Sequence, residues 1–152
     1  MASEVDICNL ALGHIGDEAT VASLDPPEGS AQAEHCARFY PVARDALLEL
    51  HSWGFASRRI RLALLSSGWP EWEYAYAQPA DALNILAVLP DGVTDDYQPQ
   101  EFACEIDDNG AQVIYTDQAG AALRYTALVT DTTRFSPLFV TALSWHLASM
   151  LA

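Results

Sequence analysis

The sequence contains no lysine, and its seven basic residues are all arginines. Because 21 residues are acidic, the formal net charge is −14 at pH 7. A surface this acidic repels phosphate groups, so ordinary binding of nucleic acid through its backbone is disfavoured.

Long hydrophobic runs and a basic N-terminus are also missing. No apolar stretch approaches the roughly 20 residues that span a bilayer, and Glu4 and Asp6 stand where a signal peptide needs positive charge. We therefore expect a soluble protein that is not secreted and has no membrane partner. Cysteine is scarce as well: Cys8, Cys36 and Cys104 are few and far apart, which favours reduced, buried thiols, with a disulfide between two of them as the alternative.

Sequence motifs for catalysis or metal binding are absent too. There is no H-E-x-x-H or C-x-x-C pair, no G-x-S-x-G turn, no P-loop and no G-x-G-x-x-G stretch. The histidines are scattered, and we interpret them as hydrogen-bonded packing residues: His14, His35, His51 and His146. The sequence therefore predicts no enzyme, no cofactor and no metal site.

The composition that remains is that of a folded domain. Hydrophobic residues make up 51% of the 152 residues and charged residues 18%, a globular balance. Hydrophobic spacing predicts helices over about 4–15, 30–51 and 136–151, and a β region over about 55–130. This order predicts an α+β fold in one domain, 1–152, in which N-terminal helices and a C-terminal helix pack with a small, mainly antiparallel β-sheet.

Local signals mark the ends of these helices. Ser3 is a candidate N-cap with Asp6 in the capping-box position, and Ser136 followed by Pro137 suits the start of the last helix. Pro41 is expected to kink or split the second helix. The first two helices carry one predicted apolar stripe each: Val5, Cys8, Leu12 and Ile15, then Ala33, Cys36, Tyr40, Ala43, Leu47 and Leu50. The last helix is apolar on almost every side, which predicts burial all round or contact with a neighbouring subunit.

Period-two alternation and turn residues predict strands in the middle of the chain. The predicted strands are 55–65, 74–76, 84–89, 102–106, 112–116 and 122–129. Asn109-Gly110 between two of them is a strong hairpin signal. The same segment partly matches a calcium-binding loop through Glu105 and Asp107, but Thr116 stands where that loop needs a glutamate, so we favour the hairpin.

Two charged clusters and a group of aromatic residues are candidates for partner binding. The acidic run is either a solvated loop or a wall that DNA passes without binding: Asp91, Asp95, Asp96, Glu101, Glu105, Asp107 and Asp108. The basic cluster consists of Arg58, Arg59 and Arg61. It either forms the solvent-exposed face of a strand or pairs with carboxylates of an adjacent subunit. The tryptophans and tyrosines near Trp53, Trp69 and Trp72 serve core packing or an interface.

A series of short blocks follows in order along the chain: 7–16, Ser23-Leu24, Tyr40, Arg44-Asp45, Leu48, 53–56, 74–76, 79–81, Arg124-Tyr125, Asp131 and 135–139. This ordered series resembles podovirus tail tubular protein A and related phage head-to-tail adaptor proteins. The likeness covers nearly the whole chain, and its specificity lies in the order of the blocks. Gly54 departs from the asparagine that relatives often carry, and the chain stops at Ala152 inside an apolar helix where relatives usually continue.

The resemblance implies a virion structural protein without catalysis. Such adaptors form dodecameric rings between the portal and the tail or nozzle protein, with DNA passing through the middle without specific binding. The implied location is the portal–tail junction of the virion, and the host cytoplasm during assembly. Candidate subunit or portal contacts are Arg58, Arg59, Arg61, Trp69, Trp72 and Trp145. Candidate channel-facing acids are Asp91, Asp95, Asp96, Glu101, Asp107 and Asp108.

Three other interpretations compete with an adaptor. One is a head-completion or neck protein of a different phage tail type, although the aromatic blocks near Trp53 and Tyr74 favour the tail tubular family. Another is a small acidic binding domain from a bacterium or a prophage. An enzyme is the weakest, because it would need a site that the motifs do not contain.

Overall fold

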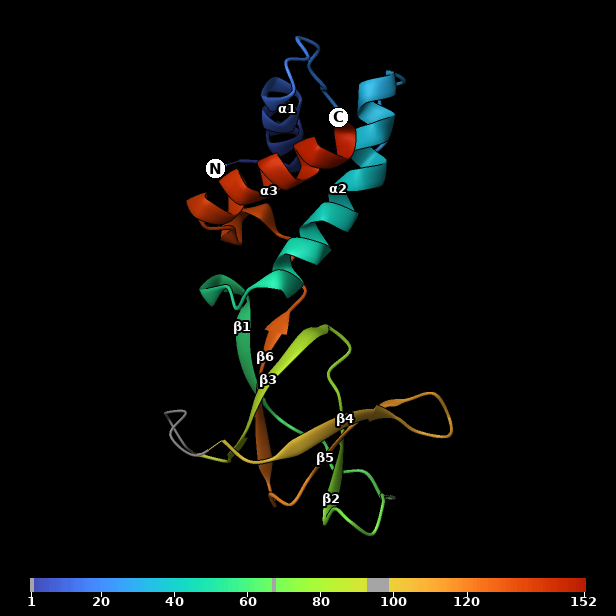
Figure 1. The fold of residues 1–152 in the computed structure, drawn as a ribbon, viewed down its shortest axis with the longest axis vertical. Helices are drawn as coiled ribbons and strands as arrows, with labels where there is room; N and C mark the ends of the chain where they lie inside the picture. The colour runs from blue at the N-terminus through green and yellow to red at the C-terminus, as the bar shows by residue number, and fades with distance from the viewer. Residues whose placement is uncertain (1, 67, 93–98) are drawn as a thin grey trace. The chain divides into compact units, whose positions relative to one another are not determined.

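The computed structural model describes residues 2–66, 68–92 and 99–152. Within these residues the chain has three α-helices and two antiparallel three-stranded sheets, which confirms the predicted α+β class (Figure 1). The chain divides into two compact units, one of Met1–Phe55 with Val129–Ala152 and one of Ala56–Leu128. All three helices belong to the first unit and both sheets to the second. The assignment of 1–152 to one domain stays a prediction.

Helix α1, Glu4–His14, begins with the capping box that the sequence predicted. Ser3 Oγ accepts a hydrogen bond from the backbone N–H of Asp6, and the Asp6 carboxylate accepts one from the N–H of Ser3. The predicted apolar stripe was partly wrong, because the buried face is formed by Ile7, Cys8, Ala11 and Leu12. Ile15 is 38% exposed, since the helix ends at His14 and the chain turns at Gly16.

Helix α2, Ala31–Leu50, is continuous through Pro41 and changes direction part-way along (Figure 1). Its side chains follow the predicted stripe from Ala33 to Leu47. At the C-terminal end Leu48 is buried instead of Leu50, which is 80% exposed. The helix therefore accommodates proline as a bend without being split.

Helix α3, Pro137–Leu151, is capped by Ser136, whose Oγ accepts a hydrogen bond from the N–H of Phe139. Its buried side chains lie on one face and meet α1 and α2. Phe139 is the centre of an aromatic cluster, with ring centroids 5.0 Å from Trp53, 4.9 Å from Phe55 and 4.7 Å from Phe135. This cluster joins the end of α2 to the start of α3 inside the first unit.

The second unit contains two sheets with the strand orders β1-β6-β3 and β2-β5-β4. The strands are β1 Ser57–Arg61, β2 Tyr74–Ala77, β3 Ala82–Pro90, β4 Phe102–Ile106, β5 Gln112–Thr116 and β6 Ala121–Ala127. Inward side chains of both sheets form one core cluster that includes Tyr76, Val88, Ile114, Leu123 and Tyr125. The sequence predicted one sheet, whereas the structure has two because the chain after β1 leaves the first sheet.

That crossing explains why the strand predicted over 55–65 is shorter than expected. Gly54–Ala56 forms a 3₁₀ turn, and pairing with β6 covers only Ser57–Arg61. The chain then pairs with β2, where the N–H of Leu65 donates to the carbonyl of Ala75. One continuous segment thus contributes to both sheets.

The hairpin predicted at Asn109-Gly110 is confirmed between β4 and β5. Gly110 has a φ of 83°, a left-handed conformation that glycine adopts without strain. Asp107 Oδ1 accepts hydrogen bonds from the N–H groups of Asn109 and Ala111. This oxygen therefore holds the turn closed.

Candidate interaction surfaces

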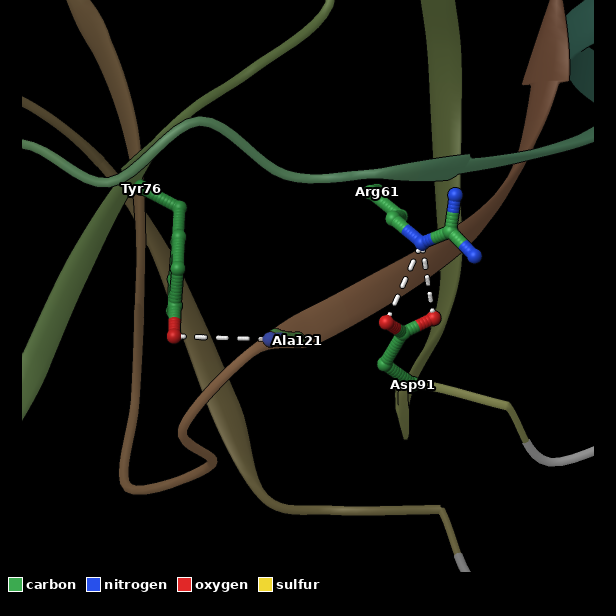
Figure 2. A network of polar contacts seen from close by, with 4 residues as sticks. All are labelled: Arg61, Tyr76, Asp91 and Ala121. Carbon is green, nitrogen blue, oxygen red and sulfur yellow. Dashed lines mark hydrogen bonds and ion pairs between the residues drawn. The ribbon is translucent and has the colours of Figure 1, made fainter.

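The predicted arginine cluster lies on β1, and two of its members form ion pairs within the second unit. Arg58 Nη1 lies 2.8 Å from Asp81 Oδ2. Figure 2 shows the second pair, in which Arg61 Nε donates to both carboxylate oxygens of Asp91 at 3.0 and 3.1 Å. Arg59 lies opposite Arg124 on β6. The Arg58 and Arg61 pairs are exposed, so each is worth about 1 kcal/mol or less.

Asp81 is the better embedded of the two acidic partners. Its second carboxylate oxygen accepts a hydrogen bond of 2.9 Å from the hydroxyl of Tyr125, a core residue of β6. Burial, together with this bond, raises the pKa of Tyr125. Arg58 therefore completes a structural network that runs from β1 to the core.

The described part of the acidic run does not form one patch. Asp91 follows β3 and pairs with Arg61, Glu101 precedes β4, and Asp107 and Asp108 lie in the β4–β5 turn. Because β4 separates Glu101 from Asp107, these two acids lie at opposite ends of a strand about 17 Å long. Two further candidates, Asp95 and Asp96, lie outside the described residues.

Of the predicted tryptophan contacts, Trp69 and Trp72 lie in the second unit. Trp72 is half-buried and packs against a cluster of Ala75, Val113 and Tyr115 on the outer face of the sheet β2-β5-β4. Trp69 is 54% exposed. It lines a hollow of about 270 Å³ together with residues of the β4–β5 turn. The structure thus brings Trp69 and Asp108, which the sequence placed in two separate candidate sites, to one groove.

Trp145 lies on the exposed face of α3 in the first unit and is 56% exposed. Its ring stacks on His14 with the centroids 3.7 Å apart and the planes 7° apart. His14 Nε2 is also 3.0 Å from Ser144 Oγ, which confirms the interpretation of this histidine as a hydrogen-bonded packing residue. The stack holds the indole in place without burying it.

The exposed face of α3 decides between the two expectations for the last helix. It is not buried all round, because Leu138 is 70% exposed and lies two turns before Trp145 on the same side. Thr141 and Ser149 complete this stripe, and α3 contains no Asp, Glu, Lys or Arg. Exposed apolar residues on an uncharged helix are typical of an interface.

The cysteines provide no reactive site in the first unit. Cys8 and Cys36 are free and fully buried, whereas Cys104 is exposed, so the prediction that all three are buried was wrong for Cys104. Cys104 is the middle residue of β4, and exposure increases along this strand from the half-buried Phe102 and Ala103 to the exposed positions 104–106. A hydrogen bond with Cys36 and burial both raise the pKa of the Cys8 thiol, which keeps it protonated and unreactive.

Across the described residues, no group of three or more His, Cys, Asp or Glu side chains is arranged to hold a metal ion. Within the same part of the chain, none of the helices has the length and hydrophobicity needed to cross a bilayer. Comparison of the sequence with models of known protein families finds no match, and comparison with curated proteins finds none either.

Proposed function

We propose that this chain is a virion structural protein, a subunit of a phage head-to-tail adaptor ring that lies between portal and tail. The observation that carries the proposal is the exposed face of α3, which presents Leu138 and Trp145 without any charged residue. It is supported by the ordered sequence blocks that resemble tail tubular protein A.

The charge of the chain is the reason why this face matters for self-assembly. Two copies with a net charge of −14 repel each other over most orientations. A contact costs least where it brings few carboxylates together, and in a ring the α3 face of one copy would meet a different face of the next. The uncharged stripe of α3 supplies one side of such a contact, and burying a leucine such as Leu138 contributes about 1.5–3 kcal/mol.

The aromatic and charged residues of the resembling blocks have structural roles that suit a scaffold. Trp53 Nε1 donates to the carbonyl of Leu47 at 2.9 Å, and its ring packs on Phe139. Arg44 pairs with Asp45 at 2.8 Å and lies over the ring of Tyr40, 5.9 Å from its centroid. These contacts stabilise the helical unit and leave the α3 face for a neighbour, as a ring built from heterologous contacts requires.

Light scattering tests this proposal, first on the chain alone and then after mixing with the portal protein of the same phage. We expect a ring-sized species in at least one sample. Leu138→Asp should abolish it, because the new carboxylate would be buried against a neighbouring subunit. Leu50→Asp is the matched control, since Leu50 is equally apolar, 80% exposed and in the same unit, but lies on α2. A monomer in both samples, without portal binding, would show that the chain is not an adaptor.

A further inference from the structure

Leu65, Gly68 and Trp69 form one side of the groove and lie beside the sheet β2-β5-β4. The N–H of Leu65 bonds to the carbonyl of Ala75, and the N–H of Trp72 bonds to the carbonyl of Trp69. Gly68 permits the close approach, because a Cβ at this position would come 3.3 Å from the Cβ of Ala75. Trp69, which is 54% exposed, thus lies at the outer face of the sheet and not in the core.

The wall facing Trp69 is acidic. Glu105 pairs with Val113 across β4 and β5, so both side chains project from the outer face on which Trp69 lies. Asp107 and Asp108 follow in the adjoining turn. The residues that line the groove are Leu65, Gly68, Trp69, Glu105, Ile106, Asp107, Asp108, Val113 and Tyr115, and none of these is basic.

We infer that this groove binds an arginine side chain carried on an otherwise apolar segment of another protein. Glu105, Asp108 and the oxygen of Asp107 that does not bond to the turn attract a positive charge. The rings and aliphatic groups of Trp69, Ile106 and Val113 attract apolar surface. A guanidinium suits both, because it stacks on an indole and forms forked hydrogen bonds with carboxylates. Lysine stacks less well on an indole, because its ammonium group is compact and strongly hydrated.

A second copy of the chain is a weaker candidate for the occupant. Of its seven arginines, four lie in ion pairs within the chain: Arg44, Arg58, Arg61 and Arg134. A second copy would also bring its own net charge of −14 to an acidic groove. These charges favour a basic segment of a different protein. The inference does not depend on the adaptor proposal, because it concerns the second unit and not the α3 face.

The test uses the full chain and the peptide acetyl-Gly-Leu-Arg-Leu-Gly-amide at concentrations up to about 10 mM, a range that detects weak binding. Binding is followed by NMR on the isotope-labelled protein, through the indole N–H of Trp69 and the backbone N–H of Val113. We expect saturable shifts at these two groups that weaken as salt is added. The same peptide with neutral citrulline in place of arginine should bind at least about threefold more weakly, because it lacks the charge.

Two variants separate a built groove from general attraction to an acidic protein. Glu105→Gln should weaken binding by about two- to fivefold, as loss of one exposed charge pair does. Glu101→Gln removes the same charge at the other end of β4 and should leave binding nearly unchanged. Equal effects of the two variants, or absence of shifts at Trp69, would overturn the inference. So would loss of self-assembly in Glu105→Gln without peptide binding, because the occupant would then be a second copy.

Discussion

Replacing each of three buried tyrosines by phenylalanine removes a hydroxyl whose surroundings differ from case to case. Tyr40, Tyr76 and Tyr125 are all 2% exposed or less. The Tyr76 hydroxyl donates to the carbonyl of Gln118 at 2.7 Å, and that of Tyr125 donates to the Asp81 carboxylate at 2.9 Å. The Tyr40 hydroxyl has no hydrogen-bond partner among the described residues.

These environments predict an order of effects on the free energy of unfolding. Tyr76→Phe should cost about 1–2 kcal/mol, because it removes a neutral hydrogen bond to Gln118 and a long one, 3.5 Å, from the N–H of Ala121. Tyr125→Phe should cost about 1.5–3 kcal/mol, because its acceptor is charged. Tyr40→Phe should be neutral or stabilise the protein by up to about 1 kcal/mol, since the hydroxyl is desolvated without compensation. The usual penalty for removing a buried tyrosine hydroxyl is therefore absent at position 40.

Urea unfolding followed by circular dichroism and by tryptophan fluorescence measures these differences. A second readout comes from alkaline pH, because burial raises the pKa of Tyr40 above its ordinary value of 10, with the charge of Glu4 as the next cause. The pKa of Tyr40 is therefore higher in the folded chain than in the unfolded chain. This difference contributes fully to the free energy of unfolding below about pH 10, and the contribution is lost as the pH rises through the folded pKa. Stability should thus fall less steeply above pH 10 in Tyr40→Phe than in the unmodified chain.

One result would refute this reasoning. If Tyr40→Phe destabilised the protein as much as Tyr125→Phe, the Tyr40 hydroxyl would have a strong partner in solution. The packing around Glu4 and Arg44, which line the same hollow as Tyr40, would then differ from the structure.

Three further substitutions test the helical unit. Leu143→Ala should cost about 2–5 kcal/mol in urea unfolding, because Leu143 is fully buried, whereas Leu50→Ala on the exposed end of α2 should cost less than about 0.5 kcal/mol. Ser136→Ala removes the N-cap of α3 and should lower the free energy of unfolding by about 1 kcal/mol, while Ser149→Ala should not. Hydrogen bonds from Ser3 hold the pKa of Asp6 below its ordinary value of 3.8, so the stabilisation is present above that pH and is lost as the pH falls through the folded pKa. An acid titration of Asp6→Asn should therefore show a shallower loss of stability below about pH 4 than the unmodified chain.

Features set by neighbouring residues could be predicted from the sequence. The capping box at Ser3, the Ser136-Pro137 helix start and the Asn109-Gly110 hairpin each depend on a few adjacent residues with strong conformational preferences. Their positions in the structure agree with the sequence to within about one residue.

Features set by distant segments could not be predicted in the same way. Periodicity placed Ile15 on the buried face of the first helix, but where a helix ends and which side its neighbours cover depend on tertiary packing. The passage of residues 57–65 from one sheet to the other, and the meeting of Trp69 with Glu105, depend on contacts between segments far apart in sequence. The apolar composition of α3 was visible in the sequence, but it left open whether the helix is buried all round or keeps one face exposed.

Charge separates the two candidate surfaces more sharply than hydrophobicity does. Both expose a tryptophan to nearly the same extent, Trp69 at 54% and Trp145 at 56%. The α3 stripe around Trp145 lacks charge, so contacts between like-charged copies through this face should strengthen as salt screens their mutual repulsion. The groove around Trp69 is lined by three carboxylates, so its contact with a cation should weaken under the same conditions. If the two proposals hold, added salt should therefore strengthen self-association through α3 and weaken binding of a basic partner at the groove, a pair of opposite responses that one salt titration of each complex measures.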